Sequence, residues 1–103
     1  MDPKDRVLYV QIIAQVLIAD GVLADRERAH LDRIASSLKM PDEEKRAALR
    51  GVSLDSPVEE RVSALSDAAK SNLLDEVEKA LHVDGEISNS EKYLLERVRK
   101  LVS

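Results

Sequence analysis

Apolar residues recur along most of the chain with the period of an α-helix. Within residues 25–39, for example, Leu31, Ile34, Ala35 and Leu38 stand at positions i, i+3, i+4 and i+7, which is the stripe of an amphipathic surface helix. No stretch alternates between apolar and polar residues with the period of two that marks a half-buried strand. The pattern therefore predicts an all-α fold.

Prolines and glycines mark where the predicted helices start and stop. Proline is favoured at the first position of a helix, and glycine just beyond its end. In this chain the three prolines open apolar-periodic segments and the three glycines close them. About six helices joined by short loops follow: Pro3 to about Ile18, Asp25 to Lys39, Pro41 to Arg50, Pro57 to about Leu65, a Ser66 cap to His82, and a last one after Gly85 with Leu94, Leu95, Val98, Leu101 and Val102.

The first of these helices is predicted to lie near the centre of the fold. Asp2 is placed to cap it, and its apolar residues lie on nearly every face except along a ridge of Gln11 and Gln15. The fifth helix carries a second long apolar stripe. We expect two helix pairs to pack around these two apolar helices.

Length and composition predict one domain with its own core. Of 103 residues, 44% are hydrophobic and 35% are charged, and 20 acidic against 16 basic residues give a net charge of −4. Without cysteine there is no disulfide, no thiolate nucleophile and no cysteine-ligated zinc. Without Phe or Trp little is left to stack on bases, so we expect no nucleic-acid partner. The apolar stretch 7–19 is too short to span a bilayer and follows no basic leader, which predicts no membrane insertion and a cytoplasmic location.

The strongest signal is an internal repeat. Sliding the chain over itself by 64 residues aligns the junction of the first two helices with the junction of the last two. Both junctions read Asp-Gly-x-(Leu or Ile)-x-x-x-Glu, which predicts two equivalent helix-loop-helix units. The identical positions are Leu17, Asp20, Gly21, Glu27, Leu31 and Arg33, which match Leu81, Asp84, Gly85, Glu91, Leu95 and Arg97.

Each residue of this motif has a structural use. Glycine leaves a helix at positive φ without steric cost, and Asp20 and Asp84 can accept hydrogen bonds from the loop N–H groups beyond them. Glu27 and Glu91 fall at the third helical position, where a carboxylate bonds free N–H groups and opposes the positive end of the helix dipole. With Ser88 as the N-cap, Glu91 completes a capping box.

The same spacing matches the second half of an EF-hand calcium loop, which has acid, glycine, aliphatic and acid residues in this order. The first half of such a loop is missing, so each junction offers two carboxylates. If the fold brings the junctions together, Asp20, Glu27, Asp84 and Glu91 form a candidate site for a divalent cation such as calcium, magnesium, manganese or zinc. Helix capping and cation binding both stay open at this point.

The two motifs resemble those of the TerB family, which is linked to bacterial tellurite resistance. The resemblance rests on Ile18-Ala19-Asp20-Gly21 with Glu27, and on His82-Val83-Asp84-Gly85-Glu86-Ile87 with Glu91. Members of this family, like the similar N-terminal domain of a membrane-anchored DnaJ-type co-chaperone, are small all-helical domains for which a metal-related role has been proposed. The resemblance implies that residues 1–103 form one TerB-like domain, that its acidic positions are the four named above, and that it works in a stress response involving metals or the membrane periphery.

A weaker signal points to a carrier protein. Residues 54–56 read Leu-Asp-Ser and are followed by Val58 and Glu59, which resembles the Asp-Ser-Leu signature of acyl and peptidyl carrier proteins. In that resemblance Ser56 would hold a phosphopantetheine arm. Pro57, however, stands where the signature has leucine, and a capped helix start explains the same residues.

The two histidines, His30 and His82, give little support for zinc or for catalysis. They lie on separate predicted helices, and a histidine in a last helical turn is typical of an interaction with the negative end of the dipole. Neither has a candidate nucleophile nearby in the sequence, so we predict no catalytic triad and no enzymatic activity.

Basic residues of the second and sixth predicted helices alternate with acidic ones at helical spacing. This arrangement predicts solvated, ion-paired faces and not a nucleic-acid patch. The prediction covers Arg26, Arg28 and Arg33 in one helix and Arg97, Arg99 and Lys100 in the other.

The sequence therefore favours a non-enzymatic module that acts through a protein partner or self-association, with a weak divalent-cation site as a further expectation. Peripheral membrane association would then come only through a partner. The alternatives are a plain scaffold or dimerisation domain with no ligand, in which exposed apolar side chains make the contact, and the carrier protein that uses Ser56.

Overall fold

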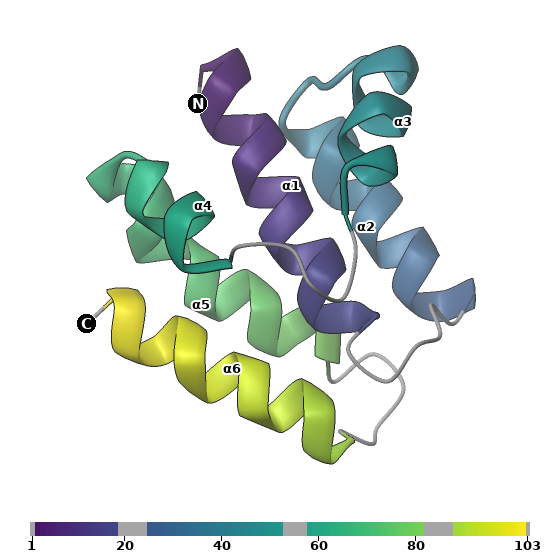
Figure 1. Ribbon diagram of the computed structural model, residues 1–103. Coiled ribbons are helices and arrows are strands. Elements are labelled where there is room, and N and C mark those ends of the chain that lie inside the picture. The colour runs from purple at the N-terminus through teal and green to yellow at the C-terminus, as the bar shows by residue number, and fades with distance from the viewer. Residues whose placement is uncertain (1, 19–24, 53–57, 82–87, 103) are drawn as a thin grey trace.

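The first helix, α1 (Pro3–Leu17), runs through the middle of the molecule and contacts all five other helices (Figure 1). The computed structural model describes residues 2–18, 25–52, 58–81 and 88–102. These ranges contain six helices and no strand, which confirms an all-α fold in a single domain. The helices after α1 are α2 (Asp25–Ser37), α3 (Asp42–Arg50), α4 (Val58–Ala64), α5 (Asp67–Leu81) and α6 (Asn89–Val102).

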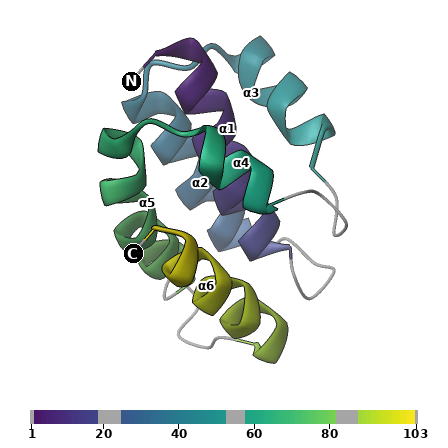
Figure 2. The same cartoon turned by 60° about the vertical axis from the view of Figure 1, so that its left-hand side comes forward.

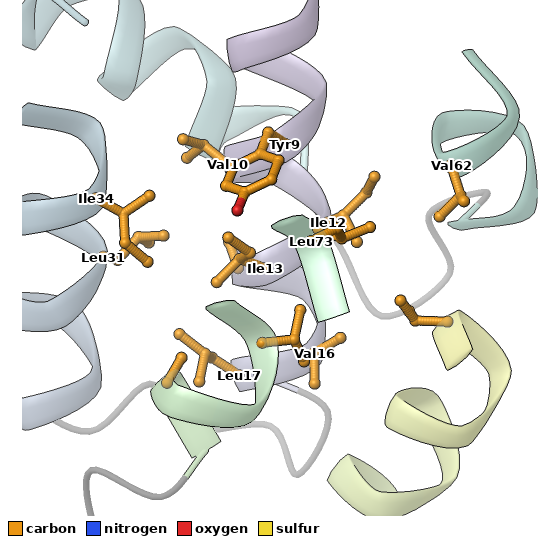
Figure 3. Packing of buried hydrophobic residues seen from close by; sticks show 14 of the residues in the cluster. Tyr9, Val10, Ile12, Ile13, Val16, Leu17, Leu31, Ile34, Val62 and Leu73 are labelled. Carbon is orange, nitrogen blue, oxygen red and sulfur yellow. The ribbon is translucent and has the colours of Figure 1, made fainter. Parts of the chain in front are cut away.

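The hydrophobic core surrounds the C-terminal half of α1. Every residue from 12 to 17 is buried, and Leu31 of α2, Val62 of α4 and Leu73 of α5 approach this helix from different sides (Figure 3). The predicted central position of α1 is therefore confirmed. The glutamine ridge does not face water as a whole, because Gln15 is only 2% exposed.

The apolar stripes read from the sequence face this core. Their buried members are Leu31, Ile34 and Ala35 on α2, Ala69, Leu73, Val77 and Ala80 on α5, and Leu95 and Val98 on α6. Leu38, Leu94, Leu101 and Val102 are partly buried against the same cluster. Over the described residues, no helix combines the length and the apolar character that crossing a membrane requires.

Side-chain caps fix the starts of α1 and α5. The N–H of Asp5 donates to Oδ1 of Asp2 over 2.8 Å, and the N–H of Ala69 donates to Oγ of Ser66 over 3.3 Å. Both predicted caps are confirmed. Asp5 in turn accepts a hydrogen bond of 3.2 Å from the N–H of Ser66, so a buried carboxylate joins the two helix starts across 61 positions of sequence.

Pro41 and Gly51 bound α3 in a way that differs slightly from expectation. Pro41 is the N-cap residue and Asp42 the first helical one, one position later than predicted. Gly51 closes the helix at φ −83°, which any residue can adopt. The glycine is better explained by the small space around it. A Cβ at this position would lie only 3.2 Å from Nε2 of Gln11, which donates to the carbonyl of Ala48.

At the end of α2, a residue other than glycine adopts the left-handed backbone conformation. Lys39 has φ 60°, its N–H donates to the carbonyl of Ser36, and the N–H of Met40 donates to the carbonyl of Ala35. These two bonds form a Schellman motif, in which glycine is the usual left-handed residue. The buried side chain of Met40 then anchors the chain before α3 begins.

Replacing Lys39 with glycine is expected to stabilise the protein by roughly 0.5 to 1 kcal/mol, because glycine adopts this conformation without the steric cost that a Cβ imposes. Chemical denaturation of the two proteins gives the difference. Lys39→Ala is the matched control, since it removes the same side chain and keeps the Cβ. An equal gain in both variants would show that the long side chain, and not the backbone conformation, limits stability.

Ion pairs tie the outer helices to one another and to α1. Nε and Nη2 of Arg6 donate to the two carboxylate oxygens of Glu44 over 2.8 and 2.6 Å, and these hydrogen bonds lower the pKa of Glu44. Lys45 of α3 reaches Asp32 of α2 over 2.8 Å. Two further pairs fasten α6: Arg99 to Glu78 of α5 over 2.8 Å, and Arg97 to Glu59 of α4.

Tyr9 is a buried phenol whose ionisation should limit stability at high pH. It is 2% exposed and donates to the carbonyl of Asn72 over 3.2 Å. Burial, and then the charges of Glu76 and Asp75, raise its pKa above the ordinary 10.0. As the pH rises, the tyrosine of the unfolded chain therefore loses its proton before the buried one does. The contribution of the protonated phenol to the free energy of unfolding is complete below about pH 10 and is lost as the pH rises further.

We expect the free energy of unfolding to fall more steeply above about pH 10 in the wild type than in Tyr9→Phe, which has no phenol there to ionise. Because the chain has two tyrosines, a Tyr93→Phe background leaves Tyr9 as the only source of tyrosinate absorbance. In that background the absorbance should appear only as the protein unfolds. Tyrosinate formed at about pH 10 in protein that is still folded would contradict this prediction.

Candidate functional site at the paired helix junctions

The helix ends that flank the two predicted junctions gather at one end of the molecule. The C-terminal ends of α1 and α5 and the N-terminal ends of α2 and α6 all lie in the lower part of both views (Figures 1 and 2). Helix α1 contacts α2 and α6, and α5 contacts the same two helices. The arrangement therefore brings the two helix pairs together at the ends that carry the motif.

Helix bounds follow the 64-residue offset, and burial follows it in part. Helices α1 and α5 are shifted by 64 residues at both ends, and α2 and α6 start 64 residues apart. Some buried positions match: Tyr9 with Leu73, Ile13 with Val77, Val16 with Ala80, Glu27 with Glu91, Leu31 with Leu95 and Ile34 with Val98. Others do not, because the buried Ile12, Gln15 and Ala35 correspond to Glu76, Lys79 and Arg99, none of which is buried. The internal repeat therefore stays a prediction.

Glu91 performs the capping role predicted for it. The N–H of Glu91 donates to Oγ of Ser88 over 3.1 Å, and the N–H of Ser88 donates to Oε1 of Glu91 over 3.0 Å. This reciprocal pair is a capping box at the start of α6. Glu91 is only 5% exposed, so this carboxylate is a buried group that accepts a hydrogen bond at the helix start.

Glu27 occupies the equivalent place in the first turn of α2. It is 6% exposed and takes part in an interaction of its own. A carboxylate is seldom buried this deeply unless the fold engages it. The two matching glutamates are therefore both interior groups.

The other predicted ligands cannot be placed next to them. Asp20 and Asp84 lie outside the described residues, as do His82 and the carrier candidate Ser56. Within the ranges that are described, no group of three or more His, Cys, Asp or Glu side chains is close enough to hold a metal ion. The four-carboxylate cation site accordingly stays a hypothesis.

His30 lies one turn after Glu27 on α2 and is half-buried. Its Nε2 atom is enclosed and makes no hydrogen bond to the described residues. No group of metal ligands among the described residues includes His30.

The sequence missed one feature of the surface. Arg97 and Arg99 are ion-paired as predicted, but no carboxylate of the described chain pairs with Arg26, Arg28 or Arg33. Arg28 instead lines a shallow depression between α2 and α3 together with Arg46, Leu49 and Arg50. Helical spacing within α2 could not reveal this, because two of the arginines come from the next helix.

Comparison of the chain with protein families, curated proteins and solved structures finds no match. The TerB resemblance therefore rests on the two motifs in the sequence.

Proposed function

We propose that this chain is a non-enzymatic, TerB-like helical module that works by contacting a partner protein. In keeping with the resemblance, we place it in the cytoplasm and in a response to tellurite or metal stress. In this proposal the junction glutamates, Glu27 and Glu91, stabilise the fold, and the binding surface lies elsewhere.

One contrast supports the proposal most strongly. The acids expected to form a ligand site include Glu27 and Glu91, which are buried and engaged, and Glu91 is used to cap α6. The arginines of the α2–α3 surface are exposed and have no ion pair to a described carboxylate. Exposed, unpaired guanidinium groups are available to an incoming protein, and arginine is enriched where proteins bind one another.

Photo-crosslinking in the native host tests the proposal. A photoreactive residue is placed singly at Ser71 on α5, Tyr93 on α6 and Ala47 on α3, all exposed positions, with and without tellurite in the medium. We expect at least one position to crosslink a specific protein reproducibly, and the others to define which face it covers. If none of the three positions gives a specific crosslink under either condition, the module has no stable protein contact and the proposal is wrong.

A divalent-cation site at the junctions is the second candidate. The gathering of the flanking helix ends at one end of the molecule favours it (Figure 1). Calorimetric titration with calcium, magnesium, manganese and zinc tests it, together with thermal unfolding in each ion. A site would give binding heat and a higher Tm in the wild type and neither in Glu27→Gln/Glu91→Gln, whereas no heat and no change in Tm in the wild type would reject it.

A further inference from the structure

The depression between α2 and α3 is built by the turn that joins these helices. Lys45 reaches back to Asp32, so an ion pair joins α3 to α2, while α3 itself packs on α1. Helices α2 and α3 run in roughly opposite directions (Figure 1). Arg28 lies one turn before Asp32, and Leu49 one turn after Lys45, which brings them to the same level of the helix pair. Both line a depression of about 310 Å³ with Arg46 and Arg50, which we call the arginine surface.

The charges on this surface are not compensated by the described chain. Arg28, Arg46 and Arg50 are exposed and make no ion pair to a described carboxylate. Arg46 and Arg50 also stand at i and i+4 on one helix, where like charges repel and destabilise it slightly. A chain with a net charge of −4 thus gathers three guanidinium groups around one depression.

The nearby acids are mostly committed elsewhere. Glu44 is bound by Arg6, and Asp42 lies 3.8 Å from Lys45. Glu43 lines an adjoining depression that Arg50 also borders. Neither Asp42 nor Glu43, which precede Arg46 by four and three residues on α3, forms an ion pair with it in the described chain.

Leu49 gives the surface an apolar component. It is half-buried and packs against the core cluster from the outside. An aliphatic side chain placed between anionic groups would cover it while the guanidinium groups bind carboxylates, for which the planar fork of arginine is well suited. The described lining holds no aromatic ring on which a base could stack, and the net negative charge of the protein repels a long polyanion.

We propose that the arginine surface binds an acidic segment of the partner protein, with an aliphatic residue among its carboxylates that contacts Leu49. This inference rests on the proposed function and names the chemistry of the partner. Binding should weaken as salt is added, because exposed charge pairs are screened.

Fluorescence anisotropy with a labelled peptide of sequence Asp-Glu-Leu-Asp-Glu tests this assignment. We expect wild-type protein to bind it, and Arg28→Gln/Arg46→Gln to bind it at least about tenfold more weakly, since two charge-assisted contacts are lost. Arg26→Gln/Arg33→Gln is the matched control, because it removes two exposed charges from α2 outside the depression and should change Kd less than about threefold. Circular dichroism verifies that both variants fold.

The assignment would be overturned by no binding of the peptide to wild type, by an equal loss in both double variants, or by tighter binding of a single-stranded DNA oligonucleotide of similar charge. The amide peptide Asn-Gln-Leu-Asn-Gln should not bind, and binding of it with equal affinity would also contradict the assignment. Crosslinking separates this failure from failure of the proposed function. A partner captured from Tyr93 or Ser71 alone would leave the function standing and reject only this surface, whereas no capture at any position would reject both.

Discussion

Leu73→Ala is expected to lower the free energy of unfolding by about 3 to 5 kcal/mol, the largest effect of any single change considered. Leu73 has no exposed surface and points from α5 toward the buried side chains of α1 (Figure 3). Truncation removes its apolar contacts and leaves a cavity that the surrounding helices fill only in part. Urea denaturation followed by circular dichroism measures the change.

Leu74→Ala is the matched control for this prediction. Leu74 is the next residue on the same helix and is only partly buried against the core, so the same chemical change should cost clearly less. Comparable losses at the two positions would show that α5 does not face α1 in the orientation described.

Glu91→Ala is expected to destabilise the protein by roughly 1 to 2 kcal/mol, because it leaves the N–H of Ser88 without its acceptor and removes a charge from the start of α6. Glu91→Gln should cost much less, since a capping box accepts glutamine in this position. Lys92→Ala, at the exposed neighbouring position, serves as the control and should be almost neutral.

The glutamine variant separates the two roles of this residue. Both Glu91→Gln and Glu91→Ala remove a carboxylate ligand, so both would impair a cation site. Only Glu91→Ala removes the capping hydrogen bond, so a capping role predicts a larger loss of stability in that variant. Equal destabilisation by Gln and Ala in the absence of cations would contradict the capping account of Glu91.

Local signals in the sequence predicted most of the helices, because their causes lie within a few residues. The caps at Asp2, Ser66 and Ser88 each depend on a side chain that meets an N–H three positions later, so position alone identifies them. Apolar periodicity similarly predicted the buried faces of α2 and α5.

Features that depend on distant residues escaped this kind of prediction. Asp5 is buried because it accepts from Ser66, 61 positions away, and nothing near Asp5 signals that contact. Lys39 takes the left-handed conformation because the Schellman bonds and the burial of Met40 outweigh its steric cost, although lysine has no preference for it.

The candidate site divides in the same way. The sequence located Glu27 and Glu91 at helix starts, and it predicted the capping box of the second, because both are local properties. It predicted ion-paired arginines on α2, whereas Arg28 shares a depression with arginines of α3. Only the turn that folds α3 back on α2 brings these charges together.

The central claim is that the junction glutamates build the fold while partner binding occurs on another surface. The most direct test is to crosslink the partner with the double variant Glu27→Gln/Glu91→Gln. A chelator removes divalent cations, and circular dichroism verifies that the variant folds. We predict the same crosslinked protein in the same yield as with wild type. A folded double variant that no longer captures the partner would show that these carboxylates act in binding, and would contradict the claim.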